Sequence, residues 1–498
     1  MNTTGHWIDG AVVHGTEESR LQDICNPATG EVIGRLALAA PEDVTRAVES
    51  ARAAFLEWSA QSLARRQTVL FAFRELLLRN ERSLAELITR EHGKLIDDAI
   101  GEIRRGVEIV EMACGMSEHL KGQYSDNSSN GIDITSYRQP LGVVAGITPF
   151  NFPVMVPLWM CPVAIATGNA FVLKPSEQDP SAALEIARLW KEAGLPDGVF
   201  TVLQGDRHTV DALIEHPDVA ALSFVGSSAV AKHIHTKASA LGKRVQALGS
   251  AKNHGVVMPD ADLDFAAEHL VAASFGAAGQ RCMALSVAVA VGDAGGGLIE
   301  RIAARAKAIR VGNGADADVD MGPLINAAAR DRVVEALGAA AASGAQIVVD
   351  GREVSETDTS GGYFVGPSLV DHVDPEMELY QQEVFGPVLA VVRVATLAEA
   401  IALVNSSRYG NGAAIFTNSG AAAREFHRSV SAGMVGVNVP IPVPAGQFSF
   451  GGWKDSLFGD QHMYGAEGVK FYTRAKVVTS RWPEALDAHE ASFTLPTT

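Results

Sequence analysis

Between residues 141 and 250, the sequence alternates strand-like and helix-like segments, and this alternation limits the fold more than any other feature of the chain. Short β-prone runs such as LGVVAGITP, NAFVLKPS and ALSFVGS are separated by stretches such as SAALEIARLWKEAGLP, in which apolar residues recur every three or four positions. Strands that alternate with helices of this length form βαβ units, and such units build a parallel sheet. The region is therefore predicted to be an α/β domain.

Two flanking regions extend this picture. The first hundred residues begin with strand-like HWIDGAVVHG and continue with amphipathic helical patterns. A second alternating stretch runs from the NHGVVMP segment to about residue 445. Because 498 residues are too many for one hydrophobic core, we expect separate domains, one from residues 1–122 and 138–248 and another from residues 249–445.

Two segments fit neither of these domains. NGIDITSYRQPLG and GVKFYTRAKVVTSRW carry alternating β-prone residues far apart in the chain. Strands of this kind often pair across subunits. We therefore predict a small β oligomerisation element from residues 123–137 and 465–485, and a homodimer or homotetramer, between which the sequence does not decide.

Charge and cysteine content limit the partners and the compartment. The 41 basic and 58 acidic residues give a formal charge of −17, which argues against a nucleic-acid partner. Four widely spaced cysteines without a CxxC pair fit free thiols in a reducing compartment. The N-terminal residues have neither a basic start nor an apolar run, so no signal peptide is expected and the predicted location is cytoplasmic.

One apolar run, residues 151–173, has the length of a membrane span. Three prolines and the Gly168–Asn169 pair interrupt it. We therefore interpret this run as a buried helix followed by a strand, and we expect no membrane partner.

Five short motifs carry the candidate chemistry. In chain order they are PFNFP with Asn151, FVLKPSE with Lys174 and Glu177, FVGSSAV with Gly226 and Ser227, GQRCMA with Cys282, and EVFGPV with Glu383 and Phe385. Together, in this order and at these separations, they resemble the aldehyde dehydrogenase superfamily over almost the whole chain. The resemblance implies an aldehyde dehydrogenase-like α/β fold, in which the first domain is a Rossmann-type NAD-binding domain and the second is catalytic.

The resemblance implies that Cys282 is the nucleophile. A thiolate adds to an aldehyde carbonyl, hydride passes to a nicotinamide, and a thioester remains on the enzyme. The side-chain amide of Asn151 and the backbone N–H of Cys282 would stabilise the oxyanion, and Phe152 would contact the substrate. The alternative is that Cys282 is a small packed residue, as isolated cysteines usually are.

The cofactor implied by the resemblance is NAD. Lys174 and Glu177 resemble the pair that binds the adenosine ribose, and the carboxylate would repel the 2′-phosphate of NADP. Gly226 and Ser227 would bring backbone N–H groups to the pyrophosphate, or would simply cap a helix. Ala231 replaces a glycine that relatives often have.

Glu383 and Phe385 are implied to contact the nicotinamide ribose and ring. The alternative for this pair is a glutamate beside a turn and a phenylalanine in the core.

One position departs from the pattern of hydrolytic family members. These carry a glutamate just before Leu-Gly that activates the water for thioester hydrolysis, whereas this chain has Ala247. The GSAKNH, RCMA and GWKDSLFGD segments instead resemble the branch that transfers the acyl group to coenzyme A, the methylmalonate-semialdehyde dehydrogenase type, which also accepts malonate semialdehyde. Coenzyme A is therefore expected as a co-substrate.

Substrates of that type carry a carboxylate, which the planar fork of arginine binds well. Arg281, next to the nucleophile, and Arg105, in GEIRRGVEIVE, are the candidates. The alternatives are an ion pair within a loop for Arg281, and a solvated helix face shared with Glu102 and Glu108 for Arg105. Loss of the substrate carboxylate as CO₂ would give propionyl-CoA or acetyl-CoA.

The sequence leaves two other functional classes as alternatives. A hydrolytic aldehyde dehydrogenase would carry its base elsewhere and release a free acid. A non-catalytic structural relative would lack part of the catalytic set, which this sequence retains. No metal site is expected, because His233 and His235 are two residues apart and would point to different sides of a helix.

Overall fold

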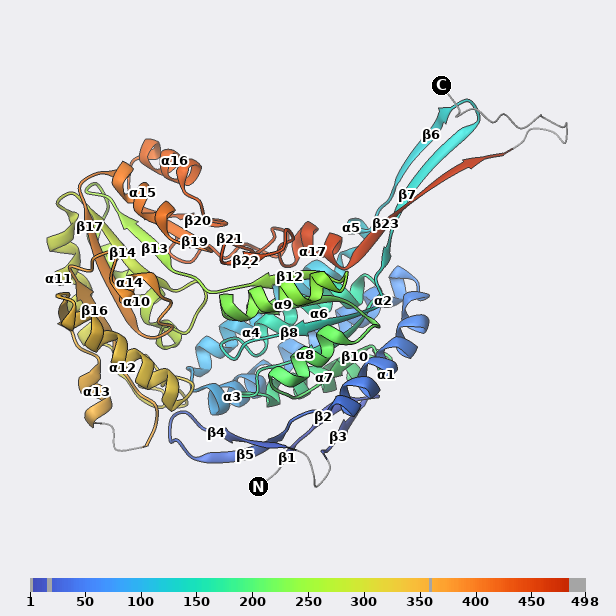
Figure 1. The fold of residues 1–498 in the computed structure, drawn as a ribbon, viewed down its shortest axis with the longest axis horizontal. Coiled ribbons are helices and arrows are strands. Elements are labelled where there is room, and N and C mark those ends of the chain that lie inside the picture. The colour runs from blue at the N-terminus through green and yellow to red at the C-terminus, as the bar shows by residue number, and fades with distance from the viewer. Residues whose placement is uncertain (1–2, 16–19, 358–360, 483–498) are drawn as a thin grey trace.

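The protein, seen as a computed structural model that describes residues 3–15, 20–357 and 361–482, consists of two α/β lobes and a projecting arm (Figure 1). The first lobe is built on one large sheet, the second lobe on another, and the arm on a small antiparallel sheet. The predicted α/β class is confirmed, and each lobe contains parallel strands alternating with helices. The active-site candidates lie where the two lobes meet.

The sheet of the first lobe has five parallel strands at its centre and antiparallel strands at its edges. In spatial order its strands are β22 (Leu457–Phe458), β12 (Arg244–Leu248), β11 (Val219–Val225), β8 (Val143–Ile147), β9 (Ala170–Lys174), β10 (Phe200–Val202), β2 (His6–Ile8) and β3 (Ala11–Val13).

Helices cover both faces of this sheet. One face is covered by α1 (Pro41–Ser59), α8 (Arg207–Glu215) and α9 (Ser228–Ala240), and the other by α6 (Met155–Ala166) and α7 (Ser181–Glu192). Outside α6 and α7 lie α2 (Leu63–Arg79), α3 (Glu81–His92), α4 (Ile96–Cys114) and α5 (Met116–His119). Successive residues of β8 alternate between the two faces, as the pleat of a strand requires: Val143 packs in the cluster with α1, and Val144 in the cluster with α6.

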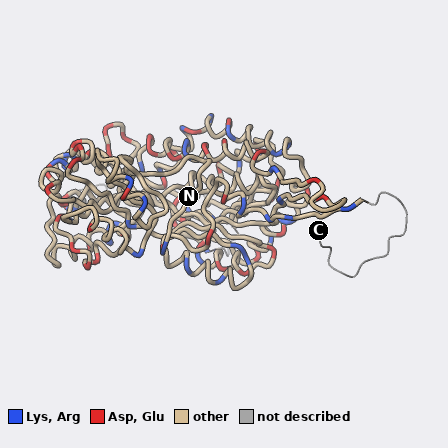
Figure 2. Tube along the Cα trace, turned by 90° about the horizontal axis from the view of Figure 1, so that it is seen from above, with Lys and Arg blue, Asp and Glu red and all other residues tan. Residues whose placement is uncertain are grey.

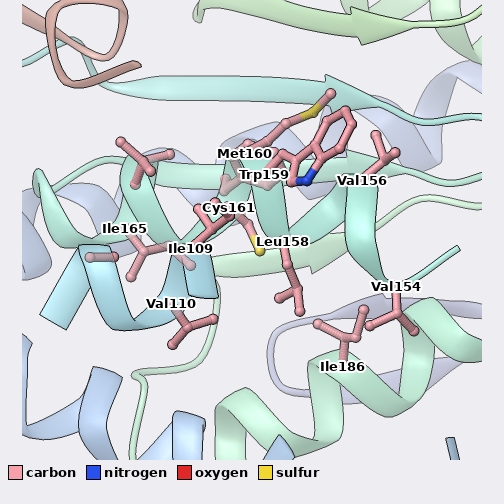
Figure 3. Packing of buried hydrophobic residues seen from close by; sticks show 14 of the residues in the cluster. Ile109, Val110, Val154, Val156, Leu158, Trp159, Met160, Cys161, Ile165 and Ile186 are labelled. Atoms are coloured by element: carbon pink, nitrogen blue, oxygen red, sulfur yellow. The ribbon is translucent and has the colours of Figure 1, made fainter. Parts of the chain in front are cut away.

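Helix α6 is buried along its whole length, which explains why its sequence shows no polar face. Its side chains interdigitate with Ile109 and Val110 of α4 and with Ile186 of α7 (Figure 3). The apolar run at 151–173 therefore forms this helix and strand β9, as predicted. Within the residues that the structure describes, no helix has the length and apolar character needed to cross a membrane.

The second lobe is formed by a continuous part of the chain. In spatial order its strands are β15 (Gln346–Val349), β16 (Ser368–Asp371), β17 (Val388–Val394), β14 (Leu285–Val291), β13 (Asn253–Val257), β19 (Gly412–Phe416) and β20 (Met434–Val437). Its helices are α10 (Leu263–Phe275), the 3₁₀ turn η1 (Gly276–Gly279), α11 (Ala294–Lys307), α12 (Ala327–Ala342), α13 (Arg352–Thr357), α14 (Glu378–Gln381), α15 (Leu397–Ser406) and α16 (Gly420–Ser429).

The arm joins two distant parts of the chain and extends away from the body (Figure 1). It consists of β6 (Gln123–Ser129), β7 (Ile132–Pro140) and β23 (Thr473–Arg481), paired antiparallel. Tyr124 and Val477 are each 64% exposed on it. Residues 465–471, which were predicted to belong to this element, form α17 (Gly465–Phe471) against α6.

Two smaller sheets complete the fold. β1 (Thr3–Thr4), β5 (Val32–Ala37) and β4 (Leu21–Cys25) form one, and β18 (Tyr409–Gly410) and β21 (Trp453–Lys454) form the other. Basic and acidic residues are interspersed along the body (Figure 2). The domain boundaries stay a prediction, although β22 brings residues 457–458 into the first lobe.

Candidate active site

A cavity of about 360 Å³ lies between the two lobes at the carboxyl ends of the parallel strands of the first sheet. This edge of a parallel sheet is where α/β proteins usually bind ligands. The first lobe contributes Pro149, Phe150, Asn151, Val225, Gly226, Ser227, Gly249 and Ser250, and the second contributes Cys282, Arg332, Gln382, Glu383, Phe385 and Tyr409. Six of the predicted site residues therefore line one cavity.

A strained turn presents Cys282 to this cavity. Ala277 and Ala278, with φ angles of 51° and 53°, precede Gly279, with a φ of 71°. A side chain at position 279 could not be accommodated, because its Cβ would lie 2.2 Å from the carbonyl oxygen of Gly386. Residues in the left-handed region cost conformational energy, and they persist at functional sites that the surroundings hold firmly.

Two buried amides hold the backbone of the nucleophile candidate. The side-chain Nδ2 of Asn253 donates to the carbonyl of Cys282 at 2.9 Å, and that of Asn411 donates to the same oxygen at 3.1 Å. Asn253 also accepts a bond from the N–H of Gly412 at 3.0 Å, so it ties strands β13 and β19 to the turn. The position of Cys282 is therefore fixed through its main chain.

The pKa of the Cys282 thiol lies above its ordinary value. Burial raises its pKa to about 12, and the nearby Glu383 carboxylate adds to the rise. The backbone N–H groups of Cys282 and Met283 act in the opposite direction without offsetting burial. A thiol in this state is a poor nucleophile until its surroundings favour the thiolate.

Asn151 lies on the loop between β8 and α6 and is buried beside the cavity. Its neighbour Phe150 meets Phe385 edge to face at a centroid distance of 5.9 Å, so an aromatic contact links the two lobes here. Phe152 is buried in the core of the first lobe, outside the cavity lining.

The predicted ribose-binding pair lies together, outside the lining of the cavity. Lys174 ends β9, and its Nζ donates to Glu177 Oε2 at 2.8 Å. Gly226 and Ser227 line the cavity, and Ser227 is the N-cap of the thirteen-residue helix α9. The N-terminus of such a helix favours a phosphate, because its N–H groups and its dipole are positive at that end. Lys174, Glu177 and this helix end therefore suit a dinucleotide.

Ala231 is fully buried in α9, so the methyl group at this position is accommodated by the packing of the helix on the sheet.

Glu383 and Phe385 enter the cavity from the second lobe. Burial raises the pKa of the Glu383 carboxyl, while a hydrogen bond from Ser250, the N–H of Ala251 and the Lys252 charge oppose the rise. Lys252 is buried and donates to the carbonyls of Leu379 and Gln382 at 2.6 and 2.8 Å, which fixes the segment leading to Glu383. Phe385 has a φ of 57°, an uncommon conformation for a bulky residue.

The two candidate arginines both lie outside the lining of the main cavity and both have acidic partners. Arg281 donates to Asp98 Oδ1 at 2.5 Å and borders a second cavity, of about 540 Å³, between α4 and α10. Arg105 pairs with Glu108 at 2.7 Å and donates to the carbonyls of Val443 and Pro444.

The alternative for Arg105 was a solvated helix face shared with Glu102 and Glu108. Its Glu102 part is wrong, because Glu102 is buried.

Ala247 points away from the cavity. It lies on β12 opposite Phe224 and Phe458, fully buried in the cluster beneath α1, α8 and α9. Gly249 and Ser250, further along the chain, line the cavity instead. The position that lacks a carboxylate in the sequence therefore belongs to the core of the first lobe.

Several residues of the site were missed by sequence reasoning. Arg332 lies on α12 in an ordinary amphipathic pattern, and Tyr409 begins a two-residue strand, so neither stood out. Asn253 and Asn411 act through backbone contacts, for which the sequence has no local signal.

Among the described residues, no group of three or more histidine, cysteine or acidic side chains is arranged to hold a metal ion. His233 instead contacts Asp211 at 3.1 Å.

Comparison with known proteins agrees with this geometry. The aldehyde dehydrogenase family matches residues 13–478. The malonate-semialdehyde dehydrogenase of Pseudomonas aeruginosa is 52% identical over 498 residues, which are 100% of both chains.

Solved structures are similar over nearly the same length. A methylmalonate-semialdehyde dehydrogenase from Oceanimonas doudoroffii superposes with a TM-score of 0.96 at 53% identity, covering 97% of this chain and 99% of that one. A protein of Sinorhizobium meliloti 1021, assigned as a methylmalonate-semialdehyde dehydrogenase and solved with NAD, also has a TM-score of 0.96, at 49% identity and the same coverage.

Proposed function

This chain belongs to the aldehyde dehydrogenase family, and we propose that it oxidises malonate semialdehyde and methylmalonate semialdehyde with NAD and transfers the acyl group to coenzyme A. The observation that carries the proposal is the meeting of Cys282 and Asn151 in one cavity beside the N-terminus of α9. The full-length similarity to a malonate-semialdehyde dehydrogenase supports the choice of substrate.

Cys282 is the proposed nucleophile. After it loses its proton, its sulfur adds to the aldehyde carbon, and the carbonyl oxygen becomes an oxyanion. The side-chain amide of Asn151 and the backbone N–H of Cys282 stabilise that charge. Collapse of the thiohemiacetal expels hydride and leaves a thioester on Cys282.

The proposed cofactor residues divide by lobe. Lys174 and Glu177 hold the adenosine ribose, Gly226 and Ser227 present the helix end to the pyrophosphate, and Glu383 and Phe385 hold the nicotinamide riboside. When bound there, NAD supplies a two-electron acceptor for the hydride. The carboxylate of Glu177 favours NAD over NADP, because a 2′-phosphate beside it would meet a like charge.

Arg105 and Arg281 are the residues proposed to bind the substrate carboxylate. Phe152, which is buried in the core of the first lobe, is the third residue proposed for substrate binding. Because each arginine has an acidic partner, a substrate carboxylate would bind as an additional or a competing acceptor for the guanidinium. Loss of that carboxylate as CO₂ leaves the electron pair as a thioester enolate, which takes up a proton to become an acetyl or propionyl group on Cys282. The thiol of coenzyme A then attacks the thioester carbonyl and releases the Cys282 sulfur.

Testing the arginines needs a matched control. Arg105→Leu and Arg281→Leu should each raise the KM for malonate semialdehyde about tenfold or more and leave the KM for propanal unchanged. Arg104→Leu is the control, since Arg104 neighbours Arg105 but pairs with Glu81 on the surface. Equal losses on both aldehydes would assign the arginines to the fold instead.

The experiment that tests the proposed function mixes protein, NAD and each semialdehyde with and without coenzyme A, and identifies the acyl product by mass. We expect one equivalent of NADH without coenzyme A, and continuous turnover to acetyl-CoA or propionyl-CoA with it. Full turnover to free acid in water alone would indicate the hydrolytic alternative. Absence of any NADH would indicate the non-catalytic alternative.

We further infer that the protein works as a homo-oligomer in the cytoplasm. The exposed apolar residues Tyr124 and Val477 on the arm suit a contact between copies of the chain. Free Cys25, Cys114 and Cys161 fit a reducing compartment. Sedimentation of the intact chain and of a Val477→Asp variant would test the assembly.

A further inference from the structure

The turn between α3 and α4 brings a buried lysine to the loop that carries Asn151. Gly93 ends α3 with a φ of 88°, a left-handed conformation typical of a helix C-terminus, and turns the chain so that Lys94 points into the first lobe. Its Nζ donates to the backbone carbonyl of Asn151 at 2.6 Å. The same Nζ lies 4.5 Å from the centroid of the Phe152 ring, within the range of a cation–π contact.

A glutamate on α4 completes the arrangement. Glu102 Oε2 accepts a second bond from Lys94 Nζ at 2.6 Å, and Glu102 Oε1 accepts from the backbone N–H groups of Val154 and Met155 at 2.9 and 3.1 Å. Val154 is the N-cap of α6 and Met155 is its first residue, so the carboxylate satisfies N–H groups that a helix start leaves without partners.

Together, the two side chains bind the loop between β8 and α6 at two points. Lys94 binds Asn151 in the middle of this loop, and Glu102 binds Val154 and Met155, where the loop passes into α6, while the ion pair joins the two side chains. The side chains of Lys94 and Glu102 are 0% and 1% exposed.

Burying two charges costs free energy that their attraction alone does not reliably return. The ion pair alone therefore does not explain the arrangement; what the two charges gain is their hydrogen bonds to the backbone groups of Asn151, Val154 and Met155, and these bonds fix the loop.

We propose that Lys94 and Glu102 are positioning residues, which fix the side-chain amide of Asn151 at the point where the oxyanion forms. The inference rests on the proposed role of Asn151 as an oxyanion donor. A donor aimed before the reaction stabilises the developing charge without paying for reorganisation, so a small displacement of the loop weakens it.

The support extends to the second lobe. The N–H of Ile96, just after Lys94, donates to the carbonyl of Gly314 at 3.3 Å, and the backbone of Gly93 lies against Gly322. Packing of α4 against α6 keeps Glu102 level with the loop, and Figure 3 shows the interdigitated side chains of these two helices. The positioning pair is therefore anchored to rigid elements on both sides.

The test measures the first-turnover burst of NADH with malonate semialdehyde, which does not require coenzyme A. Lys94→Met and Glu102→Gln should each slow the burst about 10- to 100-fold, and the Kd for NAD should stay within about threefold of the unaltered protein. Lys94→Arg keeps the charge and should recover part of the lost rate. An unchanged burst in Lys94→Met would overturn the proposal.

Either single variant leaves a buried charge without its partner and can fail to fold. The combined variant Lys94→Met with Glu102→Met removes both charges, and we expect it to fold and still to show a slow burst. Recovery of the full rate in that variant would also overturn the proposal. Asp371→Asn is the matched control: Asp371 is a buried acid that pairs with Arg393 at 2.6 Å in the second lobe, and its loss should lower the melting temperature without slowing the burst.

A double-mutant cycle separates positioning from a merely structural role. If Lys94 acts through Asn151, adding Lys94→Met to Asn151→Ala should cost no further rate, whereas independent effects would multiply. The cycle also keeps two failures apart. An unchanged NADH burst in Asn151→Ala would contradict the proposed role of Asn151 as an oxyanion donor. A slow burst in Asn151→Ala together with an unchanged burst in Lys94→Met would contradict only the positioning role of Lys94 and Glu102.

Discussion

The loop that carries Asn151 and the turn that carries Cys282 face the same cavity but are held by different chemistry. Lys94 and Glu102 bind the first with two full charges, both excluded from water. Asn253 and Asn411 bind the second with neutral amides, and both bonds end on the Cys282 carbonyl. The loop with Asn151 is therefore held by charged side chains, and the turn with Cys282 is held by neutral side-chain amides.

This difference follows the charge that each side must handle. In the proposed reaction an oxyanion forms beside Asn151, and the bonds from Lys94 and Glu102 hold the loop that carries this residue. In the proposed reaction the thiol of Cys282 switches between protonated and ionised states, and each charge near the sulfur favours one of them. The neutral amides of Asn253 and Asn411 fix the position of the sulfur without adding to the charges of Glu383 and Arg281, which already act on its pKa. Placement and electrostatic tuning can thus be supplied by separate residues.

The largest effect on the rate of NADH formation is expected from the loss of the Cys282 sulfur. Cys282→Ala should reduce NADH formation by about 10⁴-fold or more, because no other group near the aldehyde supplies the nucleophile. Binding of NAD, followed by calorimetry, should be almost unchanged. A stoichiometric NADH burst from this variant would contradict the assignment of the nucleophile.

The pH dependence of Cys282 tests whether burial outweighs the Arg281 charge, which lowers the pKa of the thiol. With its pKa raised to about 12, the thiolate fraction of Cys282 grows tenfold for each pH unit. Alkylation by iodoacetamide in the protein without NAD should therefore accelerate about a thousandfold between pH 7 and pH 10, with no plateau. Mass spectrometry locates the label, and Cys282→Ser is the control. A plateau below pH 8 would show that positive charge outweighs burial at the sulfur.

Removing the side-chain amide of Asn253 or Asn411 tests whether these amides position the turn that carries Cys282. Asn253→Ala or Asn411→Ala should lower kcat about 10- to 100-fold, because the turn can then shift by a fraction of an ångström. Each should also lower the free energy of unfolding by about 1–3 kcal/mol, since a buried carbonyl loses a partner. Asn405→Ala is the matched control, since Asn405 donates to the Ser429 carbonyl at 2.8 Å away from the cavity. Its kcat should not change.

The smallest effect on activity is expected at Ala247. Hydrolytic family members carry a glutamate at this position, but the Ala247 side chain lies in the core of the first lobe and outside the cavity lining. We expect no gain in water-dependent turnover and a loss of about 3–5 kcal/mol in the free energy of unfolding, because the new carboxylate has no partner like Lys94.

Ala247→Gln, of equal size and without charge, separates crowding from charge. Thermal melts of the two variants should differ, and equal melts would mean that the Glu side chain reaches solvent or a cation.

The fold was largely predictable from the sequence because its signals are local. Strand β9 and helix α7 have the expected periodicities, and α6 was correctly separated from a membrane span by its prolines. Cys282 and Asn151 were found because each lies in a recognisable motif.

Contacts between distant residues were not predictable. Lys94 and Glu102 look like ordinary polar residues of a helical region, and only the folded chain brings them to residues 151–155. The orientation of Ala247 was missed for a related reason: a motif gives the identity of a residue but not the face of the strand on which it lies.

The route of the chain through the first sheet has a consequence for how the protein is made. Strands β8 to β12 belong to residues 143–248, yet β12 reaches its outer partner only when Leu457–Phe458 arrive, about two hundred residues later. The second lobe uses a continuous segment and can form during synthesis before that partner appears. Contacts so distant in the chain slow folding, and an unpaired β12 edge is open to pairing with other chains in the meantime. The last step of maturation is therefore expected to be closure of this edge, and nascent chains stopped before residue 457 should be the form that aggregates.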